Sequence, residues 1–143
     1  MTMLIISKTL FAKMSDHAES DYPHECCGGL LGMLDGDSKV VMDVIPIENN
    51  WEDSGDETKT RRFRITADDY KSLEKKAKDS QQTLLGFYHS HPDHPPIPSE
   101  TDLKFAWPFF SYPILSIQNG RYESIQSYQL VGDEFERENI TID

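Results

Sequence analysis

Residues 83–102 read TLLGFYHSHPDHPPIPSETD, an apolar run that ends in two histidines and leads into a proline-rich segment. The run predicts a β-strand, and side chains at positions i and i+2 of a strand lie on the same face. His89 and His91 are therefore expected to point in the same direction, so that both rings can reach one ion. Leu85 and Phe87 follow the same alternation, and we expect them to form an apolar floor behind the histidines.

The segment that follows, residues 92–106, predicts a stiff loop and then a short helix. Its four prolines fix the backbone angle φ, and Ser99 can cap a helix over 99–106. A stiff loop can return this helix to the histidine face, where Asp102, one turn into the helix, could supply a third ligand. Two imidazoles and one carboxylate suit zinc and leave a fourth position open, which is typical of catalytic rather than structural sites.

Ser99 and Asp102 also have a purely structural interpretation. Ser-x-x-Asp at the start of a helix resembles a capping box, in which both side chains satisfy free backbone N–H groups. A His-x-His pair on a strand is by itself more often structural than metal-binding. The metal hypothesis therefore depends on Asp102 and its spacing, and capping competes with ligation for the same carboxylate.

Periodicity in the whole chain predicts an α/β (α+β) fold, in which helices flank a mixed, largely antiparallel β-sheet. Helices are expected over 8–20, 67–80 and 99–106, and strands over 3–6, 26–34, 40–47, 83–92, 112–118, 122–132 and 134–142. Residues 35–38 and 119–120 are typical of hairpin turns. Residues 49–64 are acidic in their first half and basic in their second, and we expect a long exposed loop.

Size and charge limit the function classes. The chain has 143 residues, so we expect a single domain over 1–143. The formal net charge of −11 argues against nucleic acid as a partner, because phosphate binding needs a basic surface. No apolar run is long enough to span a bilayer, and the N-terminal stretch lacks the features of a secretory signal. Cys26 and Cys27 are adjacent and would form a strained disulfide, so a reducing, cytoplasmic location is expected.

Two segments together resemble a known family. The run His89-x-His91, seven residues, then Ser99-x-x-Asp102, is similar to the signature of the JAMM (MPN+, Mov34-type) metallopeptidases. Residues 22–32, YPHECCGGLLG, resemble the Pro-x-Glu-x-x-Gly-x-Leu segment of that family, with the glutamate at the fourth position of the run. The resemblance implies the cytidine-deaminase-like MPN/JAB fold, which agrees with the element order expected above.

The resemblance, which covers roughly residues 4–132, also implies a role for each matching residue. His89, His91 and Asp102 would bind Zn²⁺, Glu25 would be the general base that activates the zinc-bound water, and Ser99 would stabilise the oxyanion. The family cleaves peptide or isopeptide bonds after the C-terminal Gly-Gly of ubiquitin-like proteins. Short bacterial-type members, which this chain resembles in size, act on ubiquitin-like sulfur carriers. The sequence carries no signal for an oligomeric state.

Further residues are predicted to contact such a substrate. Trp51, Arg62 and Phe63 lie in the long loop 49–64, and long loops beside sites often carry binding. His94 lies in the proline-rich loop next to the histidine pair, where it could meet the substrate.

Four other interpretations stay open at this point. Glu25 could be a solvated residue at the start of a strand, and a cysteine beside it could be a thiol nucleophile. The chain could be a catalytically silent MPN-type scaffold that binds partner proteins. It could also be a zinc hydrolase of small amides rather than of proteins.

Overall fold

Every helix and strand expected from the periodicity is present in the structure, a computed structural model that describes residues 3–143. The elements are β1 (Met3–Ile6), α1 (Lys8–Asp21), β2 (Cys27–Asp35), β3 (Ser38–Ile47), α2 (Ala67–Asp79), β4 (Thr83–Pro92), α3 (Glu100–Lys104), β5 (Tyr112–Gln118), β6 (Arg121–Val131) and β7 (Glu134–Ile142). Only α3 is clearly shorter than expected. None of the helices in this part of the chain has the length and apolar character needed to cross a lipid bilayer.

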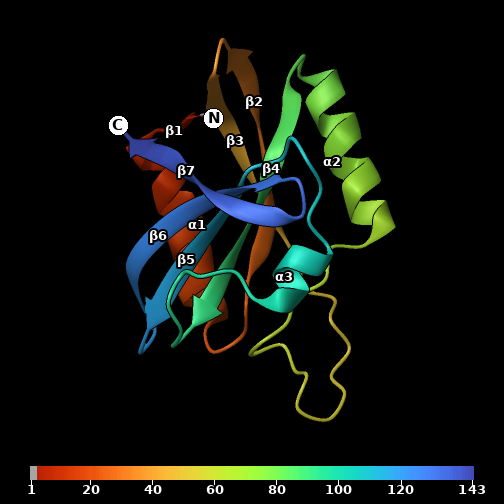
Figure 1. The fold of residues 1–143 in the computed structure, drawn as a ribbon, viewed down its shortest axis with the longest axis vertical. Helices are drawn as coiled ribbons and strands as arrows, with labels where there is room; N and C mark the ends of the chain where they lie inside the picture. Colours follow the sequence, from red (N-terminus) through yellow and green to blue (C-terminus); the bar gives the residue numbers. More distant parts are fainter. Residues whose placement is uncertain (1–2) are drawn as a thin grey trace.

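The strands form a closed barrel in the order β1-β3-β2-β4-β5-β6-β7 (Figure 1). Neighbouring strands are antiparallel except that β1 runs parallel to β3 and β7, and β4 runs parallel to β5. The predicted fold class is therefore confirmed. The closure depends on pairing between the two ends of the chain, where Met3 lies opposite Asn139.

The two long helices pack on different faces of the central strands. Leu30 of β2 belongs to an apolar cluster with Met14 of α1, whereas its neighbour Leu31 packs in a second cluster with Leu73 of α2. This alternation follows from the period of two in a strand. Figure 1 shows α2 along the outer side of β4, and α3 next to the loop 49–64 at one end of the barrel.

Two glycines allow β2 to lie between these layers. A Cβ atom on Gly28 would lie 2.3 Å from the ring of Tyr88, and one on Gly29 would lie 2.7 Å from the Leu73 side chain. A side chain at either position would have to displace the Tyr88 ring or the Leu73 side chain, so glycine serves close packing here rather than a turn.

A β-bulge changes the side-chain alternation in β4. The register between β2 and β4 shifts between Leu30 and Leu31, so one extra residue stands on β4. Leu85 consequently joins the α1 cluster, while Phe87 stays in the α2 cluster. The expectation that Leu85 lies on the histidine face is wrong. The extra residue in β4 shifts the alternation of side chains, so Leu85 and Phe87 point to opposite faces of the strand.

Candidate active site

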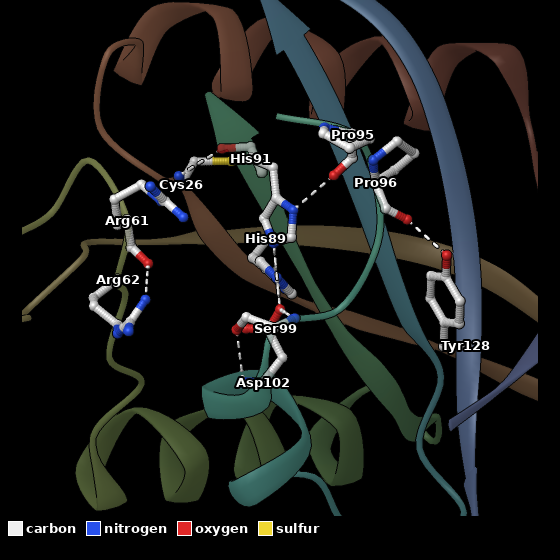
Figure 2. A network of polar contacts seen from close by, with 11 residues as sticks. Cys26, Arg61, Arg62, His89, His91, Pro95, Pro96, Ser99, Asp102 and Tyr128 are labelled. Carbon is white, nitrogen blue, oxygen red and sulfur yellow. Dashed lines mark hydrogen bonds and ion pairs between the residues drawn. The ribbon is translucent and has the colours of Figure 1, made fainter. Parts of the chain in front are cut away.

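Two histidine nitrogens from β4 and one carboxylate oxygen from α3 lie close together. The Nε2 atoms of His89 and His91 lie 3.2 Å apart, and Oδ2 of Asp102 lies 3.2 Å from the first and 3.3 Å from the second. Both histidines are buried, with 2% and 7% of their surface exposed. Figure 2 shows the two imidazoles and the carboxylate converging from the strand and the short helix.

The geometry of this triangle fits a tetrahedral zinc ion. Zinc bound at about 2.0–2.1 Å places neighbouring tetrahedral ligands about 3.3–3.4 Å apart, and all three sides of the triangle are close to this length. Nδ1 of His91 lies 2.9 Å from the Pro95 carbonyl oxygen, so it can donate its proton there and leave Nε2 as the free ligand atom. The residues could therefore hold the ion with one coordination position left open.

Asp102 serves the helix and faces the histidines with the same atom. Its N–H donates to Ser99 Oγ at 3.0 Å, and its Oδ2 accepts the Ser99 N–H at 2.9 Å, which completes a capping box. Burial would raise the pKa of the Asp102 carboxyl, but the adjacent His89 and His91 rings and the Ser99 N–H hold that pKa far below its usual range. The capping interpretation of Asp102 is confirmed, and the capping bond holds the same oxygen beside the rings, so capping does not prevent its predicted role as a ligand.

Glu25 lies against the same cluster, immediately before β2. Its carboxylate, His89 and His91 offer ligand atoms within 4.8 Å of one another, and Glu25 is only 5% exposed. Burial and the charge of Asp102 raise the pKa of Glu25 well above its usual value, against the opposing effect of Arg62 and Arg61. Asp102 stays the predicted third ligand, since its Oδ2 completes a triangle with sides of 3.2–3.3 Å, whereas the Glu25 carboxylate is grouped with the histidines only within 4.8 Å. A Glu25 carboxyl beside that triangle suits a proton acceptor.

Asn49, which the sequence analysis did not single out, fastens the long loop onto Glu25. Its Nδ2 donates to the carbonyl oxygens of Glu25 and Arg62, each at 2.9 Å, and its Oδ1 accepts the N–H groups of Trp51 and Arg64. The only signal in the sequence is an Asn pair at 49–50, one residue beyond the end of a predicted strand. Residues 49–64 form a long and mostly exposed loop, as expected, but Asn49 is buried and holds both ends of the loop against the site.

Ser90, between the two histidines, was also missed. Its Oγ accepts the Cys26 N–H at 2.8 Å, and its own N–H donates to the Cys26 carbonyl oxygen at 3.1 Å. These bonds join β4 to the residue that follows Glu25. They hold the candidate base and the candidate ligands in one rigid unit.

Two cavities border the cluster and share Arg61 and Arg62 in their walls. The aromatic groove, of about 1060 Å³, reaches His89 and Asp102 and is walled by side chains of the loop 49–66, α2, and the segment after α3. Its aromatic lining comprises Trp51, Phe63, Tyr70, Phe87, Phe105, Trp107, Phe110, Tyr112 and Phe135. The polar cavity, of about 240 Å³, is lined by Glu25, Arg61, Arg62, His91, His94, Pro95, Ile97 and Ser99.

A buried network holds the far wall of the aromatic groove. Lys39, which is 1% exposed, donates to the Phe109 carbonyl oxygen and to Ser111 Oγ at 3.0 Å. Ser111 in turn donates to Glu138 at 3.0 Å. The left-handed backbone of Phe109, with φ of 81°, is stabilised in this way, and the wall carrying Phe110 keeps its shape.

The predicted substrate contacts all line one or both of the two cavities. Phe63 stacks on the His89 ring, with centroids 4.5 Å apart, and Trp51 donates from its ring nitrogen to the Glu57 carbonyl oxygen at 2.9 Å. Arg62 lines both cavities, and His94 lines the polar one. Their contact with a substrate stays a prediction.

The two cysteines are poor candidates for a nucleophile. Both are free and fully buried, Cys26 in the α1 cluster and Cys27 in the α2 cluster. Burial raises the pKa of the Cys26 thiol to about 12, and burial likewise raises the pKa of Cys27. Little thiolate forms at neutral pH, which disfavours the thiol interpretation.

Comparison with known proteins identifies the family of the chain. The sequence profile of the family described as prokaryotic homologs of the JAB domain matches residues 7–131. The chain belongs to this family. It is similar to the desampylase of Haloferax volcanii, with 29% identity over 136 residues, which are 94% of this chain and 90% of the relative.

Two further relatives extend the comparison. The CysO-cysteine peptidase of Mycobacterium tuberculosis is 26% identical over 141 residues, which are 98% of this chain and 91% of the relative. A JAB1/MPN domain protein from Archaeoglobus fulgidus superposes with a TM-score of 0.59 at 20% identity, covering 99% of this chain and 100% of the other. The resemblance to the JAB/MPN fold is confirmed.

Proposed function

We propose that the chain is a zinc-dependent peptidase that hydrolyses the peptide or isopeptide bond after the C-terminal Gly-Gly of a ubiquitin-like or sulfur-carrier protein. The observation that supports it most is the triangle of His89, His91 and Asp102, with sides of 3.2–3.3 Å. The names of the two relatives, a desampylase and a CysO-cysteine peptidase, support the substrate class.

Zinc held by His89, His91 and Asp102 would polarise the scissile carbonyl and acidify a water molecule. Glu25 takes the proton from the attacking water and delivers it to the leaving amine. The position of Glu25 supports this role, since its carboxylate lies within 4.8 Å of both histidine ligand atoms.

Ser99 is proposed to stabilise the negative charge that develops on the carbonyl oxygen. A hydroxyl carries one donor and two acceptor sites. Ser99 Oγ already accepts the Asp102 N–H at 3.0 Å, so its own proton remains available for an oxyanion. The capping bond therefore orients the Ser99 hydroxyl and leaves its hydrogen free to donate.

The aromatic groove is proposed to bind the tail of the carrier protein. The groove reaches His89 and Asp102, so an extended tail lying in it would end at the reacting centre. Phe63, stacked on His89, restricts the approach. Glycines at the last two positions have no side chains, which lets their backbone come close to the ligands.

The test is hydrolysis of a carrier protein that bears a short extension beyond Gly-Gly, followed by intact mass spectrometry. We expect a single cut after the second glycine, which a chelator abolishes and added zinc restores. Zinc analysis accompanies it. Less than about a tenth of an equivalent after gentle purification, with no cleavage, would favour the scaffold interpretation.

The same assay separates proteins from small amides as substrates. The aromatic groove, of about 1060 Å³, exceeds what a small amide fills. A short acyl-Gly-Gly amide should therefore react far more slowly than the full carrier. Equal rates for both would contradict a carrier-specific function.

A further inference from the structure

The proline loop, residues 93–98 between β4 and α3, contacts one candidate metal ligand through a single backbone carbonyl group. The Pro95 carbonyl oxygen lies 2.9 Å from His91 Nδ1 and also accepts the Ile97 N–H at 2.8 Å. A carbonyl oxygen has two lone pairs and no proton, so Nδ1 is the donor in this contact. The free lone pair of the ring is then on Nε2, the atom that faces His89.

The prolines of this loop fix its local shape but not its position beside the ligand. Each pyrrolidine ring restricts φ of its own residue, which stiffens the segment 95–98. Asp93 and His94, which connect this stiff segment to β4, have no such ring, and Asp93 adopts a left-handed backbone with φ of 58°. Contacts from outside the loop must therefore place the Pro95 carbonyl group.

Two hydroxyl groups on neighbouring strands hold the residues on either side of Pro95. Ser116 of β5 donates from Oγ to the His94 carbonyl oxygen at 2.7 Å, and the Tyr128 hydroxyl of β6 donates to the Pro96 carbonyl oxygen at 2.7 Å. Figure 2 shows the bond between Tyr128 and Pro96. Ser116 is 0% and Tyr128 6% exposed, so water competes little for these bonds.

Strand β5 also fastens the start of the loop. Its parallel pairing with β4 places Ser116 directly opposite His91, and Ser116 Oγ accepts Gln118 Nε2 at 2.9 Å, which orients the hydroxyl. The Asp93 N–H donates to the Ile117 carbonyl oxygen at 2.7 Å. The proline loop is thus tied to the sheet at its first, second and fourth residues.

We propose that Ser116 and Tyr128 are positioning residues for the metal centre, and that they act on His91 through the Pro95 carbonyl group. This proposal rests on the proposed function, because it assumes a metal ion at the candidate site. A fixed acceptor on Nδ1 sets the tautomer and the plane of the ring and raises the basicity of the ligand nitrogen. The ring is also ordered before the ion binds, which lowers the entropy cost of binding.

The first test is the zinc dissociation constant of the purified protein, measured by competition with a chromogenic chelator at fixed pH. Direct partners of ligating histidines contribute roughly 10–100-fold to metal affinity. Ser116 and Tyr128 act one step further out, so we expect Ser116→Ala and Tyr128→Phe each to raise Kd about fivefold, and the double variant about tenfold or more. An unchanged Kd in the double variant would overturn the proposal.

Two variants of β6 provide matched controls. Tyr122→Phe removes a hydroxyl from the same strand, but this ring packs on Phe11 in the α1 cluster, with centroids 5.0 Å apart. Ser127→Ala removes a buried hydroxyl that donates to Glu138 at 2.8 Å rather than to the proline loop. Both should keep the wild-type Kd. An equal rise of Kd in the controls would indicate general loosening and overturn the positioning role.

A second readout reports on the His91 ring itself, which a loss of global stability would not change. NMR of ¹⁵N-labelled protein at saturating zinc follows the exchange of the His91 Nδ1 proton with water. This proton should be protected in the wild type and both controls, and should exchange about tenfold faster in the double variant, because its acceptor is no longer held. Equal protection in all of these proteins would contradict the proposal.

Failure of this proposal and failure of the proposed function give different results. If the wild type binds no zinc, both are overturned. If the wild type binds zinc and cleaves the carrier while the double variant keeps its Kd and its protected proton, only the positioning role is lost. If the double variant does not fold, Tyr128→Phe, which retains the ring, is compared with Tyr122→Phe, and equal Kd values in those two would overturn the role of Tyr128.

Discussion

Two helices of this molecule begin with the same motif, and only one of the two capping aspartates faces the histidine pair. In α2, Asp69 N–H donates to Thr66 Oγ1 at 3.1 Å and Thr66 N–H donates to Asp69 Oδ2 at 3.0 Å. In α3, the corresponding distances between Asp102 and Ser99 are 3.0 and 2.9 Å. The local geometry of the two capping boxes is the same.

The helices differ in what holds them to the rest of the protein. α2 has 13 residues and buries Leu73 and Ala77, whereas none of the five residues of α3 is buried. Asp102 instead faces two imidazoles. The pair teaches that a capping box can anchor a structural helix or present a carboxylate to a reacting centre, and the tertiary surroundings decide between them.

The largest difference is expected between two single variants, in each of which one capping aspartate is replaced by asparagine. Asp102→Asn should lose zinc and reduce activity about a hundredfold or more, because a charged ligand is removed. Asp69→Asn should keep zinc and activity and lose only about 1 kcal/mol of stability. Metal analysis, the mass assay and thermal melting measure the three quantities. Full zinc content in Asp102→Asn would break the comparison.

Glu25→Gln sharpens the assignment of Asp102 by separating metal binding from proton transfer. The amide cannot accept the water proton, so the rate should fall about a hundredfold or more while zinc content stays at the wild-type level. The measurement pairs single-turnover rates with metal analysis. Turnover equal to the wild type would remove Glu25 from the mechanism.

The capping hydroxyls should give a smaller difference. Ser99→Ala and Thr66→Ala should each cost about 1 kcal/mol of stability through the lost cap. Only Ser99→Ala should also lower kcat, by roughly a hundredfold or less, because it removes an oxyanion donor. Parallel melting curves and kcat values test this. Equal kcat in both variants would make Ser99 a capping residue only.

The smallest effect is expected in amide hydrogen exchange. No residue of α3 belongs to an apolar cluster, so removing zinc with a chelator should accelerate exchange in residues 100–105. α2 is held by apolar packing and should be unaffected. Mass spectrometry of peptic fragments with and without chelator makes the comparison. Equal acceleration in both helices would indicate general loosening rather than a metal held by α3.

The features predicted correctly from the sequence are those that depend on short spacings along the chain. His89 and His91 share a face because they are two residues apart in a strand. The capping box of α3 follows from the spacing of three residues between Ser99 and Asp102. Strand and helix periods predicted every element, and the adjacent cysteines predicted no disulfide. All of these relations arise from the geometry of one regular element.

The tertiary structure alone decided what lies between elements. The bulge that turns Leu85 to the other face depends on the partner strand β2, and the closed barrel depends on Met3 meeting Asn139. Asn49 folds the long loop onto Glu25, and this brings Arg61 to the polar cavity. Such contacts join residues that are distant in the chain. They arise from packing and hydrogen bonding across the whole fold, which no local spacing encodes.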